Sequence, residues 1–240
     1  MLSSHDLSVK SSEDALIGMN VDERWKVIEQ KVVLALLKGS YRELQEIAID
    51  TIKDARSLSD FYLKVVQPAM YEIGSLWQTG EISVAEEHLA TSLMNRLMAS
   101  TYSMIDTVLA HPRRKAIVIC SQNEYHELGA RILADLLELN GWNVSYLGAN
   151  TPVSEVLNHL KKNTPFLLAV SVTMSFNLVH TKKLIQSVRF DSDLKGMKIM
   201  VGGLVINESE DLWKILGADG TASSAVEAVE MAKCWWEERE

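Results

Sequence analysis

Residues 115–120, Lys-Ala-Ile-Val-Ile-Cys, form a short apolar run, and residues 124–129, Glu-Tyr-His-Glu-Leu-Gly, follow it closely. An apolar run of this length, rich in β-branched residues, predicts a buried strand. The helical pattern that comes next extends to Asn140, and residues 141–147 predict a second strand. A strand, a helix and a second strand in this order favour a parallel sheet.

The same alternation continues to the C-terminus. We expect strands at 166–172, 197–201 and 218–221, helices at about 153–162, 177–189 and 206–216, and a final helix. Five strands alternating with helices predict a doubly wound, flavodoxin-like (Rossmann-like) parallel sheet over residues 115–240. Ligands of such sheets bind beyond the carboxyl ends of the strands. The loops that follow the strands are therefore where a site is expected.

The first half of the chain has a different period. Apolar residues recur at helical spacing, and Gly39-Ser40, Leu58-Ser59-Asp60 and Thr79-Gly80 separate the repeats. Ser83 and Glu86 have the spacing of a capping box and predict the start of a fourth helix. Residues 21–110 therefore predict a four-helix bundle, an all-α domain in front of the α/β domain, and residues 1–20 predict a flexible tail.

Composition excludes several classes of function. The formal net charge of −8 and a pI near 5.3 argue against a phosphate-binding surface, so we expect no direct nucleic-acid binding. Two cysteines are too few for a disulfide framework, and no stretch of about 20 apolar residues predicts a membrane span. We therefore expect a soluble, cytoplasmic protein with no membrane partner.

One histidine has the surroundings of a metal ligand. His126 lies in the loop after the first predicted strand, with Glu124 two residues before it and Gly129 three residues after it. A carboxylate beside an imidazole can fix the tautomer in which the other ring nitrogen binds a metal. A glycine in this loop lets a bulky ligand approach the backbone closely. The three residues therefore predict a binding loop for a metal-containing cofactor.

Other residues fall at the same edge of the predicted sheet: Ser171 and Thr173 end the third strand, and Gly202-Gly203 follow the fourth. Together with the acidic-x-His-x-x-Gly loop, and in this order, they resemble the cobalamin-binding domains of the methionine-synthase type. The acidic position, usually aspartate in that family, is glutamate here. The resemblance implies that His126 is the lower axial ligand of cobalt, and that the nucleotide tail of cobalamin enters a channel lined by Ser171, Thr173, Gly202 and Gly203.

The bundle contains a second pattern. Val84, Glu87 and His88 share one face of the fourth predicted helix, and Trp77 ends the helix before it. Taken singly, these residues are ordinary in a bundle. The spacing Trp-x9-Glu-His, however, resembles that of the CarH-type adenosylcobalamin photoreceptors, over about residues 20–235. The resemblance implies that Trp77 and Val84 pack beside the adenosyl group, that Glu87 hydrogen-bonds it, and that His88 binds cobalt after photolysis.

These patterns favour a non-enzymatic light sensor or regulatory protein that binds cobalamin, preferably adenosylcobalamin, and lacks a DNA-binding domain. Its output would be a change in conformation, in homo-oligomeric state or in binding to a protein signalling partner. The alternative is a corrinoid shuttle protein of a methyltransferase system. A third possibility is a cobalamin carrier that stores the cofactor without switching.

Overall fold

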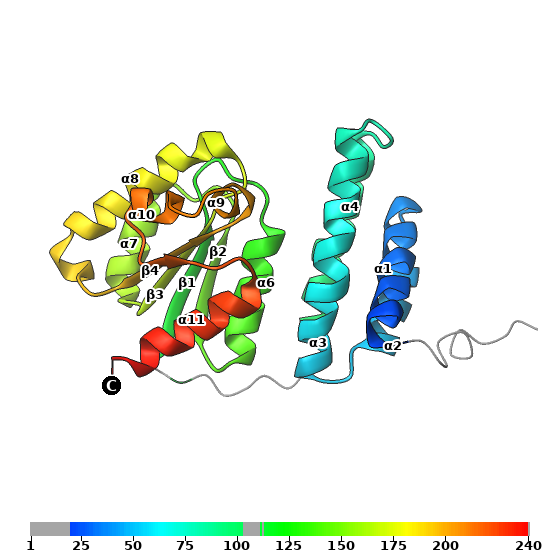
Figure 1. Ribbon diagram of the computed structural model, residues 1–240, viewed down its shortest axis with the longest axis horizontal. Helices are drawn as coiled ribbons and strands as arrows, with labels where there is room; N and C mark the ends of the chain where they lie inside the picture. Colours follow the sequence, from blue (N-terminus) through cyan, green and yellow to red (C-terminus); the bar gives the residue numbers. More distant parts are fainter. Residues whose placement is uncertain (1–19, 103–110, 112, 240) are drawn as a thin grey trace, which may run out of the picture. The chain divides into compact units, whose positions relative to one another are not determined.

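The computed structural model describes residues 20–102, 111 and 113–239 (Figure 1). The chain divides into two compact units, one up to Thr101 and one from Tyr102 onward. The predicted N-terminal tail lies outside the described residues apart from residue 20, and so does the end of the predicted bundle domain, residues 103–110.

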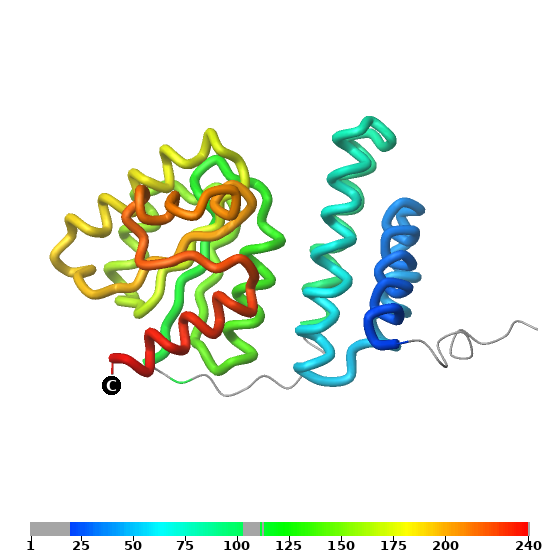
Figure 2. Tube along the Cα trace, in the orientation of Figure 1, coloured from blue at the N-terminus to red at the C-terminus, as the bar shows by residue number. Residues whose placement is uncertain are grey.

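The first unit is built from the four predicted helices. They are α1 (Val21–Leu37), α2 (Tyr41–Thr51), a third helix made of three segments, and α5 (Val84–Tyr102). The third helix consists of α3 (Ala55–Phe61), a π-helical turn η2 (Tyr62–Val66) and α4 (Gln67–Gln78). Figure 2 shows the trace running through these three segments without a break. The prediction of an N-terminal helical domain is confirmed.

Local sequence explains where these helices begin. The Ser40 side chain caps α2, and Ser83 and Glu86 form the predicted capping box before α5. The prediction that Leu58-Ser59-Asp60 separates two helices is wrong, because these residues lie inside α3. The helix begins earlier, where Asp54 and Ser57 form a reciprocal capping box.

The second unit is a five-stranded parallel sheet in the order β2-β1-β3-β4-β5, as the flavodoxin-like prediction requires. The strands are β1 (Lys115–Cys120), β2 (Asn143–Gly148), β3 (Leu167–Ser171), β4 (Lys198–Gly202) and β5 (Gly220–Thr221). The main helices between and after them are α6 (Leu128–Leu139), α7 (Val153–Asn163), α8 (Leu178–Phe190) and α11 (Ala225–Glu237). Each strand lies within about two residues of its predicted position.

The helix predicted over residues 206–216 is instead two short helices, α9 (Leu204–Asn207) and α10 (Leu212–Leu216). Residues 208–211, Glu-Ser-Glu-Asp, separate them. Serine and aspartate are weak helix formers, and three neighbouring carboxylates repel one another. The apolar spacing alone therefore overstated the length of this helix.

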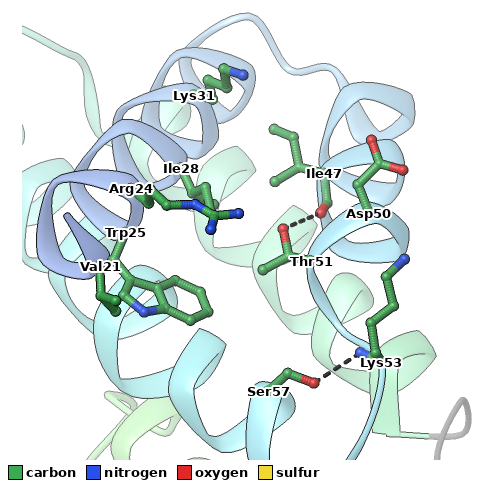
Figure 3. Close-up of a pocket in the computed structure, with 10 residues that line it drawn as sticks. All are labelled: Val21, Arg24, Trp25, Ile28, Lys31, Ile47, Asp50, Thr51, Lys53 and Ser57. Atoms are coloured by element: carbon green, nitrogen blue, oxygen red, sulfur yellow. Dashed lines mark hydrogen bonds between the residues drawn. The ribbon is translucent and has the colours of Figure 1, made fainter. Parts of the chain in front are cut away.

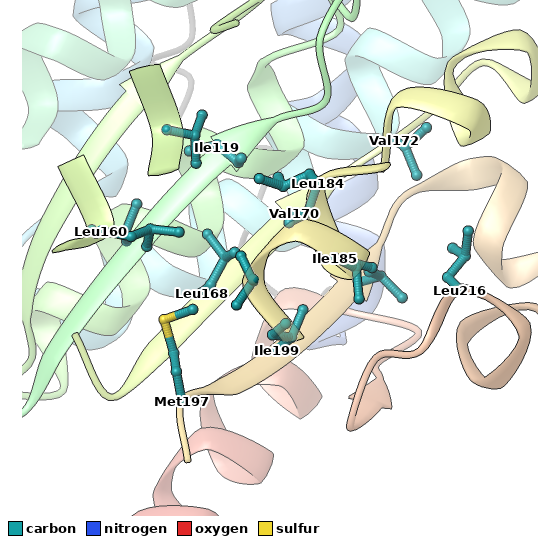
Figure 4. Packing of buried hydrophobic residues seen from close by; sticks show 14 of the residues in the cluster. Ile119, Leu160, Leu168, Val170, Val172, Leu184, Ile185, Met197, Ile199 and Leu216 are labelled. Atoms are coloured by element: carbon teal, nitrogen blue, oxygen red, sulfur yellow. The ribbon is translucent and has the colours of Figure 1, made fainter. Parts of the chain in front are cut away.

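Apolar side chains hold the sheet unit together. Ile119, Leu168, Val170 and Ile199 point from the strands toward residues of α8, among them Ile185 (Figure 4). These side chains are nearly fully buried, and packing of this kind fixes the strands in register. The sheet therefore gives a rigid base for the loops at its carboxyl edge. None of the helices in the described ranges combines the length and apolar character that a membrane span needs.

Candidate functional site

A buried carboxylate lies at the centre of the loops beyond the strands. Glu124, in the loop after β1, is completely buried. Its Oε2 accepts hydrogen bonds from the backbone N–H groups of Thr173 and Met174, at 2.9 and 3.0 Å, and from Nδ2 of Asn177, at 3.1 Å. Its Oε1 accepts from the backbone N–H of His126, at 3.2 Å. The loops after β1 and β3 are thus joined through one side chain.

These hydrogen bonds keep Glu124 ionised. Burial alone would raise the pKa of its carboxyl group. The donors from His126, Met174, Thr173 and Asn177 outweigh that effect and lower the pKa from 4.5 to about 2. An ionised carboxylate can only accept hydrogen bonds, so each donor around Glu124 must carry a hydrogen.

The carboxylate also holds the imidazole of His126. Nδ1 of His126 lies 2.5 Å from Oε1 of Glu124, and the ring itself is 58% exposed. Because Glu124 is an acceptor, Nδ1 is the donor, and in the neutral ring Nε2 then carries the lone pair. The glutamate side chain therefore reaches the histidine directly. This arrangement is typical of a histidine that binds a metal through its other nitrogen.

Sequence reasoning missed the residue that anchors this pair. Asn177 is 1% exposed, and its Nδ2 also donates to the backbone oxygen of Asn123, at 3.3 Å. The hydroxyl of Ser121 donates to the backbone oxygen of Asn177, and Thr181 donates to the same hydroxyl. No local motif marks Asn177, because its contact with Glu124 joins residues 53 positions apart.

The three predicted glycines differ in what the fold requires of them. Gly203 has a φ of 108°, and a Cβ there would lie 2.3 Å from the backbone oxygen of Val172, so the chain itself requires glycine. A Cβ at Gly129 would meet no atom within 4 Å among the described residues, and one at Gly202 would only touch the oxygen of Ala222, at 3.8 Å. The backbone conformation therefore explains why residue 203 is glycine, whereas the absence of a side chain at Gly129 and Gly202 leaves space at the carboxyl edge of the sheet.

The same edge carries polar and apolar groups. Ser171 is the last residue of β3, and Thr173 follows it, with its backbone N–H used by Glu124. Tyr125, Phe176 and Leu204 lie in the loops after β1 and β3 and at the start of α9, and each is more than half exposed. The strands β1, β3 and β4 are neighbours, so these side chains lie along the carboxyl edge of the sheet. Sequence reasoning also missed these exposed apolar residues, which suit a bulky ligand.

In the first unit, the residues of the Trp-x9-Glu-His pattern lie around the turn between α4 and α5. Trp77, near the end of α4, and Val84, the first residue of α5, are about half exposed. Glu87 accepts from the Thr91 hydroxyl, at 2.9 Å, and lies 2.6 Å from Nδ1 of His88, whose ring is 74% exposed. Trp77, Val84 and His88 are thus open to solvent on this unit, and Glu87 is partly buried beside them.

The residues at the sheet edge fit a metal that arrives already held by a ring. No group of three or more His, Cys, Asp or Glu residues within the described ranges could bind a bare metal ion. A metal that a ring already holds would need only one further donor from the protein, and His126 would offer a nitrogen whose partner fixes the tautomer. The space at Gly129 and the exposed apolar side chains suit a broad ring.

Comparison with known proteins identifies both units. The family model described as B12 binding domain matches residues 114–230, and a second model with the same description matches residues 28–100. Together the two models cover most of the chain, including the loop of Glu124 and His126 and the pattern from Trp77 to His88.

Individual relatives agree. The chain is 24% identical, over 85% of its length and 95% of the relative's, to monomethylamine corrinoid protein 1 of Methanosarcina acetivorans. It is 30% identical, over half of its length, to the HTH-type transcriptional repressor CarA of Myxococcus xanthus, of which it spans only 38%. The structure of the Methanosarcina barkeri monomethylamine corrinoid protein has the same fold, with a TM-score of 0.70 at 21% identity over 86% of this chain and 97% of that one. Both units of the chain therefore match B12 binding domains.

Proposed function

We propose that the chain is a corrinoid carrier: it holds cobalamin at the carboxyl edge of the sheet, with Nε2 of His126 as the lower cobalt ligand. The observation that carries the cobalamin site is the 2.5 Å contact between Nδ1 of His126 and the ionised carboxylate of Glu124, and the choice of a carrier rests on the whole-chain similarity described below. The cofactor, when bound, supplies a cobalt–carbon bond whose upper group can be exchanged. The protein supplies binding, orientation and a partner surface, and acts as a carrier rather than as a catalyst.

The chain's own residues divide the work. Glu124 keeps the Nδ1 proton of His126 and makes the ring a better donor, and Asn177 keeps Glu124 in place. Gly129 and Gly202 leave space for the ring and for the nucleotide tail. We propose that the tail passes Ser171, Thr173, Gly202 and Gly203.

Whole-chain similarity supports the carrier function over the light-sensor prediction. Two relatives that align with most of this chain and over most of their own length are monomethylamine corrinoid protein 1 and dimethylamine corrinoid protein 1. A carrier must expose the upper face of its cofactor to a donor and an acceptor. The open surface formed by Trp77, Val84 and His88 is compatible with that need. We propose a methyltransferase-type protein as the partner.

A light sensor is the second candidate, and a specific observation favours it. The spacing of Trp77, Glu87 and His88 resembles that of adenosylcobalamin photoreceptors, and the half of the chain that resembles the CarA repressor reaches 30% identity. In this case Trp77 and Val84 contact the adenosyl group and Glu87 hydrogen-bonds it. His88, whose side chain is largely exposed, would be available to hold cobalt after light has removed that group.

Two measurements on the reconstituted protein separate the candidates. Calorimetric titration with methylcobalamin and adenosylcobalamin tests the upper face, because Trp77 and Glu87 have little to gain from a methyl group. A carrier should bind methylcobalamin at least as tightly as adenosylcobalamin and should give up the methyl group to an acceptor bound by a partner methyltransferase. A marked preference for adenosylcobalamin, together with a change in mass or shape after green light, would contradict the carrier function.

The light-sensor candidate has its own variant. His88→Ala should abolish a photoproduct with two histidine ligands and any light-dependent change in oligomeric state, whereas His111→Ala, which removes an exposed imidazole elsewhere, should leave both unchanged. Spectra and light-scattering chromatography in dark and light give the readout. If His88→Ala and wild type behave alike, His88 does not couple cobalt to the bundle.

A further inference from the structure

A groove in the helical unit has no part in the proposed cobalamin site. It lies between the first three turns of α1 and the end of α2, with Ser57 of α3 at one end, and has a volume of about 460 Å³ (Figure 3). That volume is in the range of pockets that hold small organic molecules. None of its lining residues belongs to the loops of the sheet unit or to the pattern from Trp77 to His88.

The groove is positively charged, although the protein as a whole is acidic. Arg24, Lys31 and Lys53 line it, against the single carboxylate of Asp50. Figure 3 shows the Arg24 side chain reaching into the space between the two helices. The walls of the groove therefore favour an anion.

Two of these cations have no carboxylate partner. Four of the nine lysines and arginines in the described part of the bundle pair with a carboxylate within 4 Å, namely Lys26, Lys38, Arg42 and Lys64. Arg24 and Lys31 have no such carboxylate among the residues that the structure describes. Although the chain has 32 acidic and 24 basic residues, the positive charges of Arg24 and Lys31 can therefore pair with an anion in the groove.

The floor of the groove is apolar. The side chains of Trp25, Ile28 and Ile47 line it, and the indole of Trp25 lies across its lower part in Figure 3. The ammonium group of Lys64 stands 5.5 Å from the centre of the Trp25 ring. Lys64 belongs to the π-helical turn η2, which packs against α1.

We propose that this groove binds a small organic anion with an apolar, preferably aromatic, body. The body would pack on Trp25 and the two isoleucines, and the carboxylate, sulfonate or phosphate would lie between Arg24 and Lys31. A neutral molecule would leave both cations unpaired, and a cation would meet three like charges. The proposal does not depend on the proposed function, because the groove and the cobalamin site share no residue.

The test is calorimetric titration of the full chain, without added cobalamin, with 2-naphthalenesulfonate. We expect one saturable site per chain, and weaker binding of the neutral analogue 2-naphthalenemethanol. Arg24→Gln should weaken binding of the sulfonate about three- to fivefold, the loss expected for one exposed charged contact. Trp25→Leu should weaken both probes about two- to tenfold, because it removes the aromatic surface.

Arg42→Gln is the matched control, since Arg42 is exposed on α2, outside the groove, and pairs with Glu46. It should bind the sulfonate as wild type does. Thermal unfolding checks that each variant is folded, and Arg24→Gln keeps the test valid if Trp25→Leu is unstable. The absence of saturable binding, equal affinity for the two probes, or equal losses in Arg24→Gln and Arg42→Gln would overturn the proposal.

Discussion

Glu124→Gln is the sharpest test of the lower-ligand assignment, because it keeps the shape of the side chain and removes its charge. The carboxylate has one oxygen toward His126 and the other toward Thr173, Met174 and Asn177. A glutamine has only one oxygen, so its NH2 group must face one of the two sets. If it keeps the three donors on the loop after β3, its NH2 group faces Nδ1 of His126.

The imidazole would then accept at Nδ1 and carry its proton on Nε2, the nitrogen proposed to bind cobalt. A hydrogen bond to a charged group contributes about 1.5–3 kcal/mol. Lowering the pKa of Glu124 from 4.5 to about 2 corresponds to a similar free energy, about 3 kcal/mol. A loss of this size reduces the equilibrium constant for histidine binding to cobalt by about ten- to a hundredfold.

Electron paramagnetic resonance of the cob(II)alamin form reads this population directly, through the splitting that a coordinated nitrogen causes. We expect the nitrogen splitting in wild type, its loss in His126→Ala, and its loss or strong reduction in Glu124→Gln. Glu155→Gln, an exposed change on α7, is the control and should keep the splitting. An undiminished splitting in Glu124→Gln would refute the role of the carboxylate, and an undiminished splitting in His126→Ala would refute the ligand itself.

Three further outcomes follow from the same geometry. Folding lowers the pKa of Glu124 from 4.5 to about 2, so ionised Glu124 stabilises the fold above pH 4.5 by up to about 3 kcal/mol, and this contribution is lost as the pH falls toward 2. Urea unfolding at pH 7 and pH 3 should therefore show a smaller difference in unfolding free energy between wild type and Glu124→Gln at pH 3. Gly203→Ala should cost at least about 2 kcal/mol in thermal unfolding, because of its positive φ and the close backbone oxygen, whereas Gly202→Ala should be tolerated by the cofactor-free protein and should weaken cobalamin binding. Burial, with a smaller effect of nearby carboxylates, raises the pKa of Cys120 to about 12, so a thiol reagent at pH 8 should label the exposed Cys234 in the folded protein and both cysteines only after unfolding.

The fold could be predicted from the sequence because apolar periodicity reports burial. The runs at residues 115–120 and 166–172 placed β1 and β3 to within a residue. A strand that is buried on both faces is apolar along its length, so the ends of the apolar run mark the ends of the strand. Helix ends were harder. The start of α3 depends on the side chains of Asp54 and Ser57, and the split at residues 208–211 depends on weak helix formers inside an apolar pattern. These two helix boundaries are decided by capping hydrogen bonds and by helix propensity, and neither changes the apolar periodicity of the sequence.

Part of the candidate site could be predicted for a similar reason. Glu124 and His126 are two residues apart, so their pairing is a local property of one loop. The contribution of Asn177 requires the loop after β3 to return to the loop after β1, which only the sheet order brings about. The requirement for Gly203 likewise comes from the approach of Val172, a contact that no nearby residue in the sequence signals.

The residues proposed to lie below and above cobalt differ in how firmly the protein holds them, and this difference bears on function. The Glu124 carboxylate receives three hydrogen bonds from the loop after β3 and is completely buried, so the imidazole of His126 is oriented before any cofactor binds. The imidazole of His88 is largely exposed, and its described partner is its own neighbour Glu87. A carrier and a light sensor can therefore share the first arrangement, because both need cobalamin held from below. Since they differ in what the upper face does, changes at Trp77, Glu87 and His88 should alter ligand preference and light response while leaving the lower nitrogen on cobalt.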